Sequence, residues 1–119
     1  MGSVVDATKE TFDDLVSSGL VLVDVWAESC RPCVALAPRV EEIAASVADL
    51  TVVKLDATKA RRLCMAHQVG GVPTFLLFRD GAETARITGA NLTPGQLDAW
   101  LSAQLDSHQQ LDTHHRREK

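Results

Sequence analysis

The sequence lacks the features that mark membrane and secreted proteins. Its 119 residues contain no run of about 18 apolar residues, so we expect neither a membrane span nor membrane attachment. Residues 1–6 lack the basic start and the apolar stretch of a secretory signal, which predicts a cytoplasmic protein. The interior has no repeat and no linker-like segment, so the chain should form one domain.

Cysteine and positive charge are also scarce. The three cysteines are Cys30, Cys33 and Cys64, and an odd number without a secretory signal argues against a structural disulfide framework. The chain has 12 Lys and Arg against 16 Asp and Glu, a net charge of -4. A mildly acidic protein is a poor partner for a phosphate backbone, so we do not expect nucleic-acid binding.

The composition is that of an ordinary globular protein, with 45% hydrophobic and 24% charged residues. Along the chain, segments with the hydrophobic spacing of a helix alternate with segments typical of a strand. The pattern predicts, in chain order, a strand at 4–5, a helix capped by Thr8 and ended by Gly19, a strand at 20–26, a helix at 32–47, a strand at 51–56, a short helix around 60–67, strands at 74–78 and 83–88, and a helix after Thr93-Pro94. This order predicts an α/β fold with one central mixed sheet of about five strands between helices on both faces.

Three stretches carry clear local signals. Residues 20–26 are almost continuously apolar, which is typical of a strand buried on both faces. Asp80-Gly81, between the last two strands, favours a tight hairpin turn. Residues 107–119 hold a single apolar residue, so we expect a folded domain over 1–106 and a disordered tail over 107–119.

Cys30 and Cys33 stand two residues apart at the predicted start of the long helix. This spacing puts one thiol at the helix N-terminus and the other about one turn further on, where the two sulfurs can bond without moving the backbone. Unpaired N–H groups and the helix dipole favour a thiolate at the first position. Pro32 suits the first helical position, and Ser29 could cap the helix. We therefore expect Cys30 to be the attacking thiolate and Cys33 the resolving thiol.

A zinc site is the alternative for a Cys-x-x-Cys pair. Structural zinc needs four Cys or His ligands, usually from two such pairs. Cys64 and His67 have ligand spacing, but they lie on the inward face of a predicted helix. We expect no metal, and we interpret Cys64 as a buried core thiol rather than a redox group.

Asp24 interrupts the apolar strand at 20–26. Burial of a carboxyl group raises its pKa toward neutrality, which suits a proton acceptor. Its place six residues before Cys30 lets it lie beneath the dithiol, near Cys33; the alternative is a surface Asp at a bent strand edge. Lys54, on the next strand, either pairs with Asp24 or extends its charge to solvent along an apolar stem.

These residues together resemble the thioredoxin family. The resemblance covers residues 4–106 and rests on Val23-Asp24-Val25-Trp26-Ala27-Glu28-Ser29-Cys30-Arg31-Pro32-Cys33, Ala37-Pro38, Lys54, Gly71-Val72-Pro73-Thr74-Phe75 and Gly89-Ala90. It implies a thioredoxin fold and an enzyme that reduces protein disulfides by dithiol–disulfide exchange.

The resemblance also implies roles for individual residues. Trp26 should pack beside the dithiol, Pro73 should follow a cis peptide bond opposite it, and Gly89 should line the same docking groove. The expected catalytic residues are Cys30, Cys33, Asp24 and Lys54, and the expected substrate-binding residues are Trp26, Arg31, Pro32, Val72, Pro73 and Gly89. The Cys30–Cys33 disulfide is the redox group and no cofactor is expected. The expected partners are a thioredoxin reductase as electron donor and disulfide-containing proteins as substrates, with the chain acting as a monomer.

Two positions depart from the family pattern, which commonly has Trp before the first cysteine and Gly after it. Here these positions hold Ser29 and Arg31. Arg31 puts a fixed positive charge beside Cys30, which leaves open a less reducing oxidase or isomerase. A third alternative is a non-enzymatic module of the same fold that only binds a partner; the intact Cys30, Cys33, Asp24 and Pro73 argue against it.

Overall fold

The computed structural model describes residues 4–117, with side chains described through Asp106. The helices and strands are β1 (Val4–Ala7), α1 (Phe12–Leu15), β2 (Leu20–Trp26), α2 (Arg31–Ser46), β3 (Leu50–Asp56), α3 (Arg61–Ala66), β4 (Thr74–Arg79), β5 (Ala82–Thr88) and α4 (Pro94–Arg117). Their order is the one predicted from the hydrophobic periods.

The five strands form one mixed sheet in the order β1-β3-β2-β4-β5. β1 and β2 run parallel to β3, whereas β4 runs antiparallel to both β2 and β5. β2 is therefore the central strand, and it is buried along nearly its whole length, as its continuous apolar sequence predicted.

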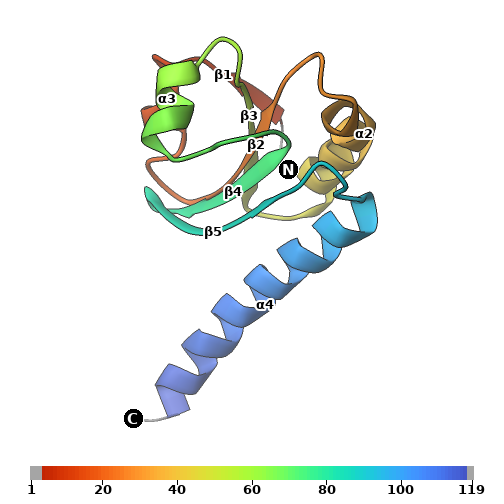
Figure 1. Cartoon of the computed structure of the whole chain (residues 1–119). Helices are drawn as coiled ribbons and strands as arrows, with labels where there is room; N and C mark the ends of the chain where they lie inside the picture. Colours follow the sequence, from red (N-terminus) through yellow and green to blue (C-terminus); the bar gives the residue numbers. More distant parts are fainter. Residues whose placement is uncertain (1–3, 118–119) are drawn as a thin grey trace.

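Helices cover both faces of the sheet (Figure 1). One core joins α1 and α3 to the sheet through Phe12, Val23, Cys64 and Leu76. The other joins α2 and α4 to the opposite face through Leu22, Leu36 and Leu97. Successive residues of β2 point to opposite faces, so Val23 and Leu22 enter different cores. Asp24, which follows Val23, lies on the α2/α4 face.

The largest difference from the predicted elements is at α1. The sequence predicts a helix from Thr8 to Gly19, whereas α1 covers only Phe12–Leu15. The helix also ends at the C-cap Val16 before reaching Gly19, and Thr8 is not its cap, because the N-cap is Thr11. The Thr8 hydroxyl accepts the N–H groups of Glu10 and Thr11 at 3.2 Å each, in the turn that precedes the helix. The hairpin prediction is confirmed: Asp80 and Gly81 have φ of 50° and 89°, the left-handed values that a two-residue hairpin turn requires.

α4 is the other element that differs. The sequence predicts that the domain ends at residue 106, whereas the backbone of α4 remains helical to Arg117 and extends past the sheet (Figure 1). No Gly or Pro occurs from 96 to 117 to end the helix earlier. The side chains beyond Asp106 and residues 118–119 lie outside the described part, so the disordered tail over 107–119 stays a prediction. No helix in the part of the chain that the structure describes is long and apolar enough to cross a membrane.

Candidate active site

Cys30 and Cys33 form a disulfide at the start of α2, with their Cα atoms 5.3 Å apart. Cys33 is only 4% exposed, whereas Cys30 is half-buried. Arg31, between them, is exposed. A partner can therefore reach the sulfur of Cys30 more easily than that of Cys33. This is the order of exposure that an attacking and a resolving thiol need.

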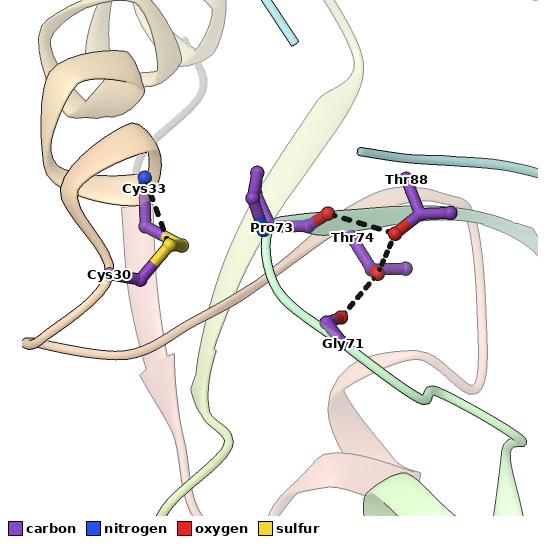
Figure 2. The surroundings of a disulfide bond; sticks show 6 residues. All are labelled: Cys30, Cys33, Gly71, Pro73, Thr74 and Thr88. Atoms are coloured by element: carbon purple, nitrogen blue, oxygen red, sulfur yellow. Dashed lines mark hydrogen bonds between the residues drawn. A yellow bond between two sulfur atoms is a disulfide. The ribbon is translucent and has the colours of Figure 1, made fainter. Parts of the chain in front are cut away.

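The helix begins in a way that the sequence did not indicate. Cys30 is itself the N-cap: its backbone is extended, with φ -89° and ψ 105°, and its Sγ accepts the backbone N–H of Cys33 at 3.2 Å (Figure 2). Ser29 is therefore not the cap, and Arg31 rather than Pro32 takes the first helical position. The backbone N–H of Cys33 is one of the N–H groups in the first turn that have no carbonyl partner within the helix. When the disulfide is reduced, such donors favour a thiolate at Cys30.

Asp24 is buried in β2, with 2% of its surface exposed. Burial raises its pKa from 3.8 to about 7, and the nearby Lys54 charge opposes this rise. The alternative of an exposed Asp at a strand edge is therefore wrong. A carboxyl group with this pKa can both take up and release a proton near neutral pH.

Lys54 is the register partner of Asp24 on β3. Its ammonium lies 4.3 Å from the centre of the Trp26 ring, a cation–π contact. Among the described residues, the ion pairs involve Arg39 and Arg86, and none joins Lys54 to Asp24. Lys54 therefore acts on Asp24 through its field rather than through a direct pair.

Pro73 directly precedes β4, and its peptide bond with Val72 is cis, as the resemblance implied. Figure 2 shows Pro73 opposite the Cys30–Cys33 disulfide, with the sulfur atoms turned toward it. Gly89, at the end of β5, donates its N–H to the carbonyl of Pro73 at 3.3 Å. Three of the predicted docking residues, Val72, Pro73 and Gly89, are thus adjacent to one another, and Pro73 is the one that Figure 2 shows facing the disulfide.

Two threonines hold this segment, and sequence reasoning assigned them no role. The Thr74 hydroxyl donates to the carbonyl of Gly71 at 2.7 Å and lies 2.7 Å from the Thr88 hydroxyl. The carbonyl of Pro73 also lies 3.1 Å from the Thr88 hydroxyl, so Thr88 can donate its one proton either to Thr74 or to Pro73 (Figure 2). The bonds join β4 to β5 across 14 positions of the sequence. Knowledge of the register between β4 and β5 would have predicted this contact, whereas the hydrophobic periodicity of the sequence does not.

A groove of about 390 Å³ lies between α3 and the segment before Pro73. Its lining is mostly apolar and includes Ala27, Cys64, Met65 and Val72, with Arg61 as its one charged residue. Met65 is 75% exposed, so an apolar surface is open to solvent here. The groove can accept an apolar side chain of a partner.

Cys64 lies on the inner side of α3, 7% exposed and unpaired. Burial raises the pKa of its thiol, which disfavours the reactive thiolate. His67, the C-cap residue of α3, packs against Phe12 with ring centres 5.3 Å apart. In the part of the chain with described side chains, no three His, Cys, Asp or Glu residues are grouped so that they could hold a metal ion.

Comparison with known proteins gives a consistent result. The family model for thioredoxin matches residues 3–103. A thioredoxin from Acetoanaerobium sticklandii is 38% identical over 96 residues, which cover 78% of this chain and 91% of the relative. A thioredoxin from Mycobacterium tuberculosis is 48% identical over 88 residues, 73% of this chain and 75% of the relative. Among solved structures, a mutant thioredoxin from Halobacterium salinarum superimposes with a TM-score of 0.72 at 33% identity, covering 86% of this chain and 88% of that one.

Proposed function

The chain belongs to the thioredoxin family and is a thiol–disulfide oxidoreductase that reduces protein disulfides, and we propose that Cys30 is its nucleophile and Cys33 its resolving thiol. The observation that supports these roles is the position of the pair. Cys30 is half-buried at the N-cap of α2, and Cys33 is buried in the first turn behind it. The helix N-terminus stabilises the thiolate of the residue that a partner can reach.

In the proposed reaction, the Cys30 thiolate attacks one sulfur of the substrate disulfide, and the substrate's S–S bond breaks. A mixed disulfide with Cys30 forms, and the first substrate sulfur leaves as a thiolate. Cys33 then gives up its proton and attacks the Cys30 sulfur, which releases the second substrate thiolate. Two electrons have passed from the dithiol to the substrate, and the Cys30–Cys33 disulfide remains.

We assign to Asp24 the removal of the proton from Cys33. Its pKa of about 7 leaves a large fraction of the carboxylate free to accept a proton at neutral pH. It lies on the sheet face that α2 covers, the helix that carries Cys33. Lys54, held over Trp26, lowers the pKa of Asp24 and so keeps part of the carboxyl group ionised.

The proposed docking surface is the segment around Val72 and Pro73, together with Gly89, Trp26, Arg31 and Pro32. An extended substrate strand would pair with the backbone beside Pro73 while its disulfide meets Cys30. The apolar groove lined by Val72 would take a neighbouring side chain. The active form would be a monomer, because one chain contains all the residues assigned here.

Membership of the thioredoxin family also supports proposals about the electron donor and the cellular compartment. We propose that a thioredoxin reductase returns two electrons to the Cys30–Cys33 disulfide, which serves as the redox group without a cofactor. A reducing compartment such as the cytoplasm suits this chain, because Cys64 is an unpaired thiol. We also propose that residues 1–106 suffice for activity.

Reduction of insulin with a dithiol as electron source tests the assignment of the cysteines. Cys30→Ser should lose activity entirely. Cys33→Ser, pre-reduced and mixed with insulin after the dithiol has been removed, should accumulate mixed disulfides, which non-reducing electrophoresis and mass spectrometry detect. Cys64→Ala is the matched control for thiol chemistry and should form mixed disulfides through the same cysteine as wild type, because its own thiol is buried and protonated. Mixed disulfides on Cys33 in the Cys30→Ser protein would reverse the roles.

A further inference from the structure

Arg86, on the edge strand β5, makes a set of bonds that the proposed reaction does not use. Its Nη1 donates to the carbonyl of Gln68 at 3.0 Å, and its Nη2 donates to the carbonyl of His67 at 2.7 Å. The Glu83 carboxylate holds the same guanidinium from the other side, accepting from Nε at 2.6 Å and from Nη2 at 2.7 Å. A bidentate pair of this kind fixes the direction of the guanidinium as well as its position.

A local irregularity of β5 makes this arrangement possible. In a regular strand, residues three apart point to opposite faces. In β5, Glu83 pairs with Phe78 and Ala85 pairs with Leu77, so the ladder has a bulge at the residue between them. The bulge brings Glu83 and Arg86 to the same face, where α3 ends.

The carbonyls that Arg86 binds are those that α3 leaves open at its C-terminus. The backbone N–H of Val69 donates to the carbonyl of Cys64 at 2.8 Å, and the backbone N–H of Gln68 donates to the carbonyl of Met65 at 3.0 Å. These are the two bonds of a Schellman motif. The motif places Gln68 at φ 58°, a left-handed position that favours glycine. The carbonyls of His67 and Gln68 stay outside the motif, and the guanidinium charge binds them at the negative end of the helix.

These bonds fix the start of the segment that carries the proposed docking residues. We call residues 67–73 the docking loop; it runs from the end of α3 to Pro73. Gly70 and Gly71 have no atom within 4 Å of the position that a Cβ would take, so packing does not restrain this part of the loop. Thr74 holds the far end through the carbonyl of Gly71.

We propose that Arg86 is a positioning residue for substrate docking: by binding the carbonyls of His67 and Gln68, it fixes the docking loop so that Val72 and Pro73 meet the substrate in one geometry. The inference rests on the proposed docking surface around Val72. A loop ordered before binding loses less conformational entropy when a substrate strand pairs with it. Arg86 should therefore strengthen protein-substrate binding and leave the chemistry at Cys30 unchanged.

The test is the single-turnover reduction of insulin by pre-reduced protein, measured at several insulin concentrations. It gives a half-saturation concentration, which reports substrate binding, and a limiting rate, which reports the chemistry. Arg86→Gln should raise the half-saturation concentration about fivefold and change the limiting rate less than about twofold. This is less than the full effect of losing hydrogen bonds to a charged group, because Arg86 acts on the substrate only through the loop. Arg86→Lys, which keeps the charge but cannot form the bidentate pair, should recover part of the loss. The rate with a small disulfide, hydroxyethyl disulfide, should stay the same in all variants because it needs no docking strand.

Arg39→Gln is the matched control. Arg39 is also an ion-paired arginine, bonded to Asp98 at 2.7 Å and to Glu42 at 2.7 Å, but it joins α2 to α4 and does not contact the docking loop. Its half-saturation concentration should equal that of wild type. If Arg86→Gln does not fold, Glu83→Gln replaces it, because that change loosens the guanidinium and should raise the half-saturation concentration in the same direction.

Two results would overturn the inference: an unchanged half-saturation concentration for Arg86→Gln, or an equal loss of rate on insulin and on hydroxyethyl disulfide. Val72→Asp tests the docking surface separately. If Val72→Asp raises the half-saturation concentration and Arg86→Gln does not, only the role of Arg86 fails. If Val72→Asp also has no effect, the proposed docking surface itself is wrong.

Discussion

Asp24 and Thr74 are the two buried polar side chains in the described part of the chain, each 2% exposed, and the sheet treats them in opposite ways. They belong to neighbouring register pairs of β2 and β4, Asp24 with Phe75 and Val25 with Thr74. Thr74 is bonded to a carbonyl and to a second hydroxyl. For Asp24, burial is the main influence on the pKa, and no hydrogen bond contributes to it.

This difference separates a structural role from a chemical one. A threonine hydroxyl does not ionise near neutral pH, so its hydrogen bonds stabilise a geometry. A buried carboxyl group without them carries a raised pKa, which costs stability when it ionises but makes proton exchange possible near neutral pH. Thr74 thus keeps the docking loop in place, while Asp24 supplies a group that can titrate.

The largest expected effect is the pH dependence that Asp24 gives to stability. The folded pKa of about 7 lies above the ordinary value of 3.8, so the folded protein binds the extra proton between these values. The stabilising contribution is complete below about pH 4 and is lost as pH rises through 7, a difference of about 4 kcal/mol. Asp24→Asn should remove this slope and should be more stable than wild type at pH 8.

Urea unfolding of both oxidised proteins at several pH values from 4 to 8 measures this, and the difference between them isolates Asp24 from the other carboxyl groups. The variant should also reduce insulin more slowly, with mixed disulfides persisting, because the resolving step loses its base. Parallel pH profiles for the two proteins would show that Asp24 is not a titrating buried group.

Thr74→Val tests the other side of the comparison and should have a smaller effect. The change keeps the shape but leaves the carbonyl of Gly71 without its donor and leaves Thr88 with only the carbonyl of Pro73. We expect a loss of about 1–3 kcal/mol in unfolding free energy, with no change in its pH slope. Thr84→Val is a suitable control, because Thr84 is an exposed threonine on β5 whose single bond to the Leu77 carbonyl is long, at 3.2 Å. Equal losses in both variants would contradict a special role for Thr74.

Arg31→Gln should have the smallest effect, because this charge stands in solvent rather than in the core. The guanidinium favours the Cys30 thiolate, which exists only in the reduced form, so wild type should be the more oxidising protein. An unscreened charge that stabilised the thiolate by the equivalent of about one pKa unit would shift the reduction potential of the Cys30–Cys33 pair by about 30 mV. Solvent screening should reduce the shift below that value. The measurement is the glutathione equilibrium potential at low and high salt. A reduction potential in the variant that is unchanged or less negative would assign Arg31 to partner choice instead. The alternative of a less reducing oxidase or isomerase would then lose its only support.

The order of the elements, the central position of residues 20–26 and the hairpin at Asp80-Gly81 could all be predicted from the sequence. Each depends on a short-range pattern: a hydrophobic period, a continuous apolar run or a turn dipeptide. The same holds for Cys30 and Cys33 at a helix start and for the burial of Asp24. The predicted helix from Thr8 to Gly19 is longer than α1, because apolar spacing does not specify where a helix begins and ends, and the structure limits it to Phe12–Leu15.

The contacts that refine the site were decided by the tertiary structure. Lys54 could have paired with Asp24 or extended to solvent, and the fold places its charge over Trp26 instead. Thr74 meets Thr88 only in the observed register of β4 and β5. Arg86 reaches the residues that follow α3 across 18 and 19 positions of sequence, and a bulge brings Glu83 to the same face to hold it. Local periods carry information over a few residues, whereas these contacts depend on how distant segments are aligned, and no short pattern in the chain specifies that alignment.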